Sequence, residues 1–178
     1  MGKLVAQNHP ALHTIAEEVT QEEFTDGTVQ KILKSMRDAL KEYNVGGFVA
    51  VAIAAPQVGI SKRIFLIEDQ GEDRDEPLPS IVAINPKIVK TSKKTHLVGE
   101  GCLSVPDQYG EVRRATNVTI QATDEQGNTY ERGAGGLLAQ IFQHEYDHLD
   151  GILFIDKAEN VIHKDELDKA HQEASHES

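Results

Sequence analysis

An H-E-x-x-H pattern, running from His144 to His148, constrains this chain more than any other feature of its sequence. Residues i and i+4 of an α-helix lie on one face, so these two histidines can bind a single cation. Glu145 is rotated by about 100° from His144 around the helix, which brings its carboxylate near water at the same ion. The pattern therefore predicts a metal centre with a general base beside it.

The residues around this pattern predict that it lies on a helix from about residue 135 to residue 149. Gly151 follows the last apolar position, where a glycine commonly ends a helix. The apolar residues that recur at helical spacing before the first histidine are Leu137, Leu138, Ile141 and Phe142.

The rest of the sequence indicates which residue supplies the third metal ligand. A metzincin protease would continue to a third histidine, but that position is Phe154. A glutamate from a later helix would need more chain than the short polar segment after His148 supplies. We therefore expect the ligand upstream, at Cys102, the only cysteine, in the stretch E-G-C-L-S-V-P. A thiolate and two imidazoles leave one coordination position open, as in a catalytic site.

Three motifs in this order resemble those of the peptide deformylase family. They are A-A-P-Q, which ends at Gln57, then E-G-C-L-S-V-P and Q-H-E-Y-D-H-L-D-G, and the resemblance covers about residues 10–156. The first motif departs from the family pattern G-x-G-x-A-A-x-Q, because Ala50 and Ala52 replace its two glycines. The resemblance implies a metal-dependent hydrolase that removes the formyl group from the N-terminal formylmethionine of newly made polypeptides and releases formate.

The resemblance, together with the residue types, implies a role for each site residue. Cys102 and the two histidines would hold the ion, which lowers the pKa of water toward neutrality. Glu145 would accept a proton from that water and later donate one to the leaving amine. The side-chain amide of Gln57 and the backbone N–H of Leu103 would stabilise the negative charge on the formyl oxygen.

The resemblance also implies that the peptide binds as an added strand, paired with Val51 and Ala52 on one side and with Gly101 on the other. Ala52 places a methyl group where the family has none. The apolar, β-compatible residues before it predict a strand, with the methyl groups of Ala50 and Ala52 turned away from the peptide.

The methionine side chain of such a substrate needs an apolar pocket. Ile141 precedes His144 by one helical turn on the same face, and Leu137 lies one turn earlier. We expect these two residues to form walls of the pocket.

The ligands leave the identity of the single divalent ion open. A Cys-His-His site accepts zinc, which is what the motif alone predicts. The family implies Fe²⁺ in the cell, with Ni²⁺ or Co²⁺ as working substitutes, because ligand identity does not settle which metal is loaded.

The sequence predicts one domain, residues 1–156, of α+β class, with small antiparallel or mixed β-sheets packed around the central H-E-x-x-H helix. A second helix is expected up to about Tyr43, where apolar residues recur every 3.6 positions. Strands are expected at residues 63–68, 81–89, 96–103, 117–122 and 128–132.

Composition favours a cytoplasmic protein. With 39% hydrophobic and 26% charged residues the chain reads as an ordinary soluble domain, with no apolar run long enough for a membrane span and no secretion leader. A lone cysteine forms no internal disulfide, which suits a reducing compartment. The formal net charge of −11 argues against direct recognition of nucleic acid.

The polar segment 157–178 is predicted to be an acidic, helical tail. Some deformylases contact the ribosome through a basic C-terminal helix, and residues 156–178 instead carry three Lys against seven Asp and Glu. A transient ribosome contact would therefore not use such a helix.

Two alternatives remain beside the deformylase hypothesis. One is a deformylase-like protein of weak activity that binds peptides, for which the alanines at positions 50 and 52 are the only support. The other is a small H-E-x-x-H protease that cleaves internal peptide bonds.

Overall fold

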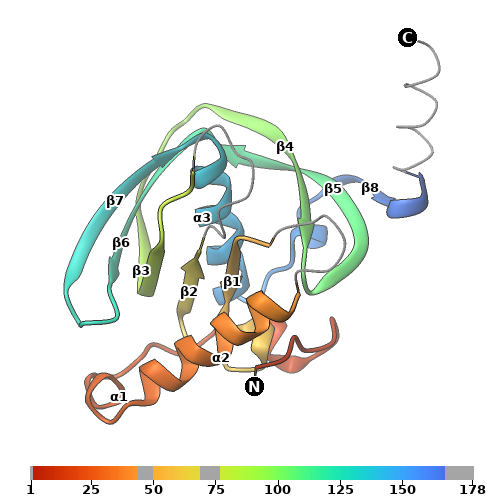
Figure 1. Ribbon diagram of the computed structural model, residues 1–178. Helices are drawn as coiled ribbons and strands as arrows, with labels where there is room; N and C mark the ends of the chain where they lie inside the picture. Colours follow the sequence, from red (N-terminus) through yellow and green to blue (C-terminus); the bar gives the residue numbers. More distant parts are fainter. Residues whose placement is uncertain (1, 44–49, 69–76, 167–178) are drawn as a thin grey trace.

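The computed structural model describes residues 2–43, 50–68 and 77–166 and has an α+β fold (Figure 1). The helices are α1 (Gln21–Thr25), α2 (Thr28–Glu42) and α3 (Gly136–Leu149), with short 3-10 helices η1 (Pro10–Leu12), η2 (Ala55–Val58) and η3 (Phe154–Asp156). The strands are β1 (Ala52–Ala54), β2 (Ile64–Ile67), β3 (Ile81–Thr91), β4 (Thr95–Cys102), β5 (Val105–Ala115), β6 (Asn117–Thr123), β7 (Thr129–Gly135) and β8 (Glu159–His163).

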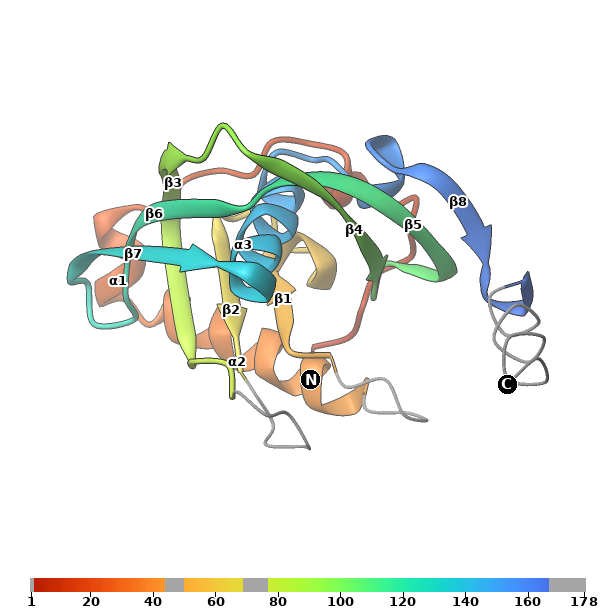
Figure 2. The ribbon, with the colours of Figure 1, turned by 90° about the horizontal axis from the view of Figure 1, so that it is seen from above.

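These strands form two antiparallel sheets with α3 at the centre of the molecule (Figures 1 and 2). The larger sheet has the order β1-β2-β3-β6-β7, and the smaller one has the order β4-β5-β8. Strands β1 and β4 are therefore both edge strands. The predicted fold class, antiparallel sheets packed around the helix that carries H-E-x-x-H, is confirmed.

The larger sheet lies between α2 and α3, and β2 shows how the sequence encodes this. Ile64 and Leu66 belong to the apolar cluster that contains the buried face of α2, whereas Phe65 and Ile67 pack with the cluster that contains α3. Side chains alternate between the two faces of a strand, so a strand that is buried on both faces is apolar at every position. This packing fixes α3, and with it both histidines, against a rigid sheet.

Helix α3 ends at a Schellman motif centred on Gly151, the residue predicted to stop it. The Gly151 N–H donates to the His148 carbonyl (3.2 Å), and the Ile152 N–H donates to the Asp147 carbonyl (3.0 Å). Gly151 has φ +73°, and a Cβ atom there would lie 2.7 Å from the Thr14 nitrogen. A larger residue at this position would disturb the end of the helix.

The smaller sheet contains two strands that the sequence did not predict. Strand β5 follows β4 after a tight turn, and every residue of β4 has a partner on β5, with an irregularity between Gly101 and Cys102. Strand β8 pairs with β5, so the prediction of a helical tail from residue 157 is wrong for Glu159–His163. Residues 164–166 are helical, and the rest of the predicted tail lies outside the described residues.

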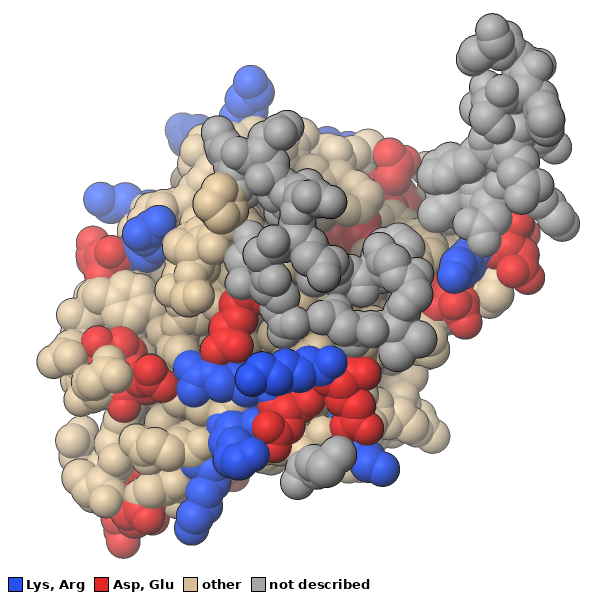
Figure 3. Space-filling view, viewed as in Figure 1, with Lys and Arg blue, Asp and Glu red and all other residues tan. Residues whose placement is uncertain are grey.

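Opposite charges alternate on the face seen in Figure 3, where basic side chains lie beside acidic ones over α2. On α2, Lys34 pairs with Asp38 (2.7 Å), and Arg37 pairs with Glu68 (2.5 Å). Within the described part of the chain, no helix has the length and apolar character needed to cross a membrane.

Candidate metal centre and substrate cleft

Cys102, His144 and His148 lie together where α3 meets the end of β4. One ligand atom from each of the three residues lies within 4.8 Å of the others. His148 Nε2 is 3.2 Å from Cys102 Sγ, and the ring centroids of the two histidines are 5.0 Å apart. The three residues predicted as ligands therefore form a cluster that can hold a metal ion.

The position of Cys102 depends on the tight turn between β4 and β5. Cys102 pairs with Val105 across this turn, and Leu103 and Ser104 form its tip. The Ser104 N–H donates to Cys102 Sγ at 3.4 Å. The turn thereby directs the sulfur toward α3.

Electrostatics favour the thiolate form of Cys102. Burial opposes ionisation, but His148 and His144 outweigh it and lower the pKa of the thiol well below its ordinary value. Because the thiolate is the form that binds metal ions, the surroundings of Cys102 suit a ligand rather than an inert buried thiol.

Glu100 orients His144. His144 Nδ1 and Glu100 Oε2 are 2.8 Å apart, so a proton on Nδ1 is donated to the carboxylate and Nε2 is left to face the cluster. Arg114 holds the same carboxylate with two hydrogen bonds of 2.7 and 2.9 Å. Burial alone would raise the pKa of Glu100, but the bonds from Arg114 and His144 lower it to about 2.

Arg114 extends this charge network to the surface. Its side chain is 3% exposed and also donates to Asp147 at 2.6 Å, and Asp147 in turn accepts from Lys157 at 2.6 Å. We call Glu100, Arg114, Asp147 and Lys157 the buried charge network. Sequence reasoning did not assign Glu100 or Arg114 a role, although Glu100 begins the motif that contains Cys102.

Glu145 lies beside the cluster and is almost completely buried, with 4% of its surface exposed. Burial raises the pKa of its carboxyl group, and the neighbouring His144 and His148 only partly oppose this effect. A carboxyl group whose pKa is raised toward neutrality is better matched to proton transfer than an exposed one.

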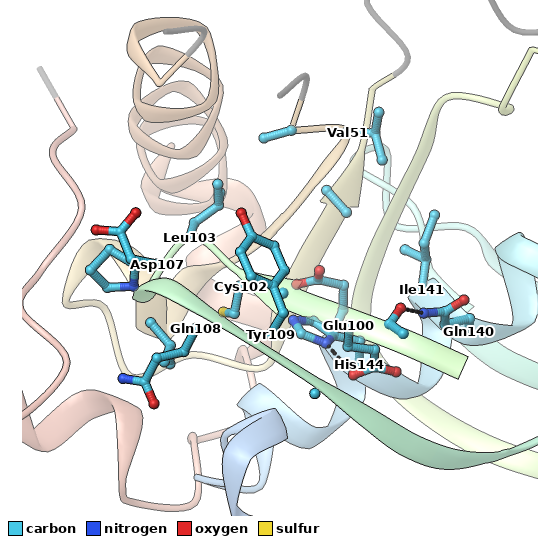
Figure 4. Close-up of a pocket in the computed structure, with 18 of the residues that line it drawn as sticks. Val51, Glu100, Cys102, Leu103, Asp107, Gln108, Tyr109, Gln140, Ile141 and His144 are labelled. Atoms are coloured by element: carbon cyan, nitrogen blue, oxygen red, sulfur yellow. Dashed lines mark hydrogen bonds and ion pairs between the residues drawn. The ribbon is translucent and has the colours of Figure 1, made fainter. Parts of the chain in front are cut away.

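Gln57 directs its amide group at the same cluster. The residue is 1% exposed, and its Oε1 accepts a hydrogen bond from the Ala54 N–H (2.8 Å). This bond turns Nε2 toward Ser104 Oγ (3.2 Å) and Cys102 Sγ (3.6 Å). The amide donor therefore points toward the candidate ligand Cys102. Leu103, the second candidate donor, lines the same site directly after Cys102 (Figure 4).

A cleft of about 820 Å³ opens beside the ligand cluster (Figure 4). Ile141 is 8% exposed and belongs to its inner wall, whereas Leu137 is 50% exposed and lies at its rim. Ala50 lines the cleft as well. All residues predicted to contact substrate line this cleft, and they are Val51, Ala52, Gly101, Leu137 and Ile141.

Strand β1 presents a free edge to the cleft. The Glu68 N–H donates to the Val51 carbonyl at 2.8 Å, so the polar backbone groups of Val51 face β2. Groups of successive residues in a strand point to opposite sides. The backbone N–H and C=O groups of Ala52, which lies opposite Ile67, therefore point away from β2.

Strand β4 presents the second free edge. The Thr116 N–H donates to the Lys94 carbonyl at 3.0 Å, directly before the β4–β5 register begins with Thr95 opposite Ala115. By the same alternation, the backbone groups of Gly99 and Gly101 point away from β5. An extended peptide can therefore pair with both sheets at once.

The donor set of the cluster fits one divalent ion. Glu100 occupies Nδ1 of His144, which leaves one nitrogen from that ring, one from His148 and the Cys102 sulfur as ligands. Glu145 Oε2 and His148 Nδ1 are buried without a hydrogen-bond partner among the described residues. The unpaired carboxylate oxygen next to three ligand atoms is what a site built for a cation and a reacting water requires.

A cluster of three candidate ligands, with a buried carboxylate and an apolar cleft beside it, is typical of metal-dependent hydrolases. Residues 1–164 match the sequence model of the polypeptide deformylase family. The peptide deformylase of Carboxydothermus hydrogenoformans is 41% identical over 91% of this chain and 96% of its own length. That of Natranaerobius thermophilus is 40% identical over 92% of this chain and 96% of its own length.

Solved structures give the same result. A class I type b peptide deformylase from Acinetobacter baumannii, bound to Met-Ala-Ser, superposes with a TM-score of 0.79 and 34% identity, covering 88% of this chain and 98% of that one. The Thermotoga maritima peptide deformylase gives a TM-score of 0.75 and 32% identity, covering 89% of this chain and 98% of that one. The chain belongs to the polypeptide deformylase family, whose enzymes remove the N-formyl group from newly made polypeptides.

Proposed function

We propose that Glu145 is the general base in the hydrolysis of the formyl group of formylmethionyl peptides, beside one divalent ion held by Cys102, His144 and His148. The observation that carries this proposal is the position of Glu145. It is a buried carboxylate of raised pKa, adjacent to the three candidate ligands and open to an apolar cleft.

The ion, when bound, supplies Lewis-acid chemistry and lowers the pKa of water. Glu145 accepts a proton from the attacking water on its carboxylate and returns it to the amine nitrogen as the C–N bond breaks. The products are formate and a free N-terminal amine. Gln57 Nε2–H and the Leu103 N–H donate hydrogen bonds to the formyl oxygen as negative charge develops on it.

The resident ion in the cell is proposed to be Fe²⁺, with Zn²⁺, Ni²⁺ or Co²⁺ as alternatives. A set of one thiolate and two imidazoles accepts all four metals, so availability and handling decide which is loaded. Metal analysis of protein purified without oxygen, compared with protein purified in air, measures this directly. Zinc as the main metal in the anaerobic sample would contradict the assignment of iron.

The peptide is proposed to bind as an added strand between β1 and β4, with backbone hydrogen bonds to Ala52 and Gly101. Both strands run toward the ligand cluster, so a peptide whose formyl group lies at the cluster runs antiparallel to each. The methionine side chain then enters the pocket between Leu137 and Ile141. Val51, whose backbone groups face β2, contributes its side chain to the wall.

The substrates proposed for this chemistry are nascent chains in the cytoplasm. Any contact with the ribosome would be transient, and residues 156–178 are too acidic to serve as a basic helix in it. The proposal includes no direct recognition of nucleic acid and no membrane partner.

The decisive experiment compares three peptides with the iron-loaded protein. Formyl-Met-Ala-Ser should be converted to formate and free Met-Ala-Ser. Acetyl-Met-Ala-Ser and an unformylated peptide with the same internal bonds should remain intact. Cleavage of internal bonds would favour the protease hypothesis, and tight binding of the formylated peptide without release of formate would favour the peptide-binding hypothesis.

Replacing a ligand should remove the metal. In Cys102→Ala, His144→Ala or His148→Ala, bound metal is expected to fall sharply, because three protein ligands leave none to spare. Elemental analysis of the purified variants measures it. His163→Ala is the matched control, since this histidine lies on β8 and its side chain is 56% exposed. Full, tight metal binding by Cys102→Ala would show that the upstream ligand is a different residue.

Ala52→Gly should change kcat/KM for formyl-Met peptides only a few-fold. Ala52 shares a strand face with Ala54, which packs in the cluster that contains α3, so its methyl group is directed out of the plane in which a paired peptide lies. The substitution should lower the free energy of unfolding by about 0.5–1 kcal/mol through added backbone freedom. A rise in activity of several orders of magnitude would instead show that the methyl group blocks the cleft.

A further inference from the structure

Gln140 connects the helix of the metal centre to the edge of β4. It lies on the face of α3 that lines the cleft, next to Ile141 and one turn before His144. Its Nε2 donates a hydrogen bond of 2.9 Å to the Gly99 carbonyl (Figure 4). The polar side chain of Gln140, in the wall of an apolar pocket, thus donates a hydrogen bond to the backbone of β4.

The acceptor of this bond belongs to the free edge of β4. The backbone groups of Gly101 and Gly99 both point away from β5, as the register between β4 and β5 requires. A peptide that starts at the metal centre and runs antiparallel to β4 meets Gly101 first. Gly99 then lies opposite the peptide residue two positions further along the chain.

We propose that Gln140 is a specificity-determining residue. By occupying the Gly99 carbonyl, it limits the backbone hydrogen bonds between the peptide and β4 to those made with Gly101. The inference rests on the proposed function and names which part of the substrate is recognised. Because the Gln140 amide already donates to the Gly99 carbonyl on this edge, the peptide N–H two residues beyond the partner of Gly101 finds no free acceptor there. The enzyme then recognises the backbone of only the first residues and accepts any continuation of the chain.

The same bond also covers part of the exposed edge of β4. An uncovered row of N–H and C=O groups pairs readily with any extended chain. Covering the Gly99 carbonyl removes one acceptor from this edge, directly next to the part beside the metal centre.

The test replaces single amides of formyl-Met peptides by esters, which removes one N–H at a time without adding bulk. For each peptide the ratio of kcat/KM between ester and amide is measured in the wild type and in Gln140→Met. In the wild type, the ester at the position that pairs with Gly101 should lower kcat/KM, and the ester two residues further should have no effect. In Gln140→Met both esters should lower it, the second by about two- to ten-fold, the range of one neutral hydrogen bond.

Two further variants complete the design. Gln140→Glu keeps the size of the side chain but cannot donate to the Gly99 carbonyl, so it should reproduce the new ester effect. Gln108→Met removes an amide from another part of the cleft and should keep the wild-type pattern of ester effects. The ratio of kcat/KM between ester and amide is taken within each protein, so a change in the overall activity of a variant does not affect the comparison.

The outcomes separate this inference from the proposed function. Absence of formate release from the all-amide peptide by the wild type would overturn the proposed function and this inference with it. Formate release with the same ester pattern in the wild type, Gln140→Met and Gln140→Glu would overturn the inference alone. A new ester effect at the second position in both Gln140 variants, and not in Gln108→Met, would support it.

Discussion

Glu145→Gln is expected to lower kcat for formyl-Met peptides by about 10²- to 10⁴-fold, the usual contribution of general acid–base catalysis. Glutamine keeps the shape of the side chain but cannot accept a proton from water. The variant should still bind metal, because Glu145 is not one of the three clustered ligands. The measurement is kcat and KM together with metal content on the same preparations.

The adjacent Tyr146→Phe is the matched control for this substitution. Tyr146 also lies on α3, but its ring lies under the Arg63 guanidinium at 5.2 Å rather than at the metal centre. Its loss of a hydroxyl group should leave both kcat and bound metal near the wild-type values. A rate for Glu145→Gln within a few-fold of the wild type would remove Glu145 from the mechanism.

The metal centre could be predicted because most of its geometry is local. Residues four apart on a helix meet without any knowledge of the fold, and Gly151 marks the end of that helix by a turn conformation that glycine favours. Cys102 lies far from the histidines in the sequence. It was predicted as a ligand because the sequence offers no suitable third ligand after His148, and because of the order of the three motifs. Nothing in the periodicity of the sequence indicates that β4 ends beside α3.

Strand β5 was missed because a buried charge hides its alternation. Its inward positions include Gly110, Val112 and Arg114, and the outward neighbours are polar. Alternation of apolar and polar residues, the usual sign of a strand, therefore fails at Arg114, and Pro106 further argues against a strand. Strand β8 is mostly exposed and has no apolar face to detect.

The ion-pair partners of Arg114 could not be predicted from the sequence either. Arg114 meets Glu100 across the β4–β5 pair and Asp147 on α3, so its contacts depend on the register between two strands and on the packing of a helix against them. Neither can be inferred from the spacing of these residues in the chain. The structure is needed to show that Glu100 and Asp147 share one buried cation.

Arg114→Met is expected to lower the free energy of unfolding by about 3–5 kcal/mol, because removing one partner of a buried ion pair leaves uncompensated charge inside the protein. Glu100 would lose both bonds from Arg114 and keep only the one with His144, and Asp147 would keep only Lys157. Metal affinity should fall roughly 10- to 100-fold as well, since Glu100 would no longer fix the His144 ring. Urea unfolding of metal-free protein measures the first effect, and metal titration measures the second.

The pH dependence and a matched control distinguish this explanation from a simple loss of packing. Glu100 has a pKa of about 2 in the folded protein against an ordinary value of 4.5, so its pairing stabilises the wild type fully above pH 4.5 and is lost as the pH falls toward 2. The difference in stability between wild type and Arg114→Met should therefore shrink over that interval. Lys157→Met removes the outer cation of the same network, but its side chain is 42% exposed, so it should cost only about 0–1 kcal/mol. Equal losses in the two variants, or a loss from Arg114→Met that does not change with pH, would show that burial of charge is not what makes Arg114 important.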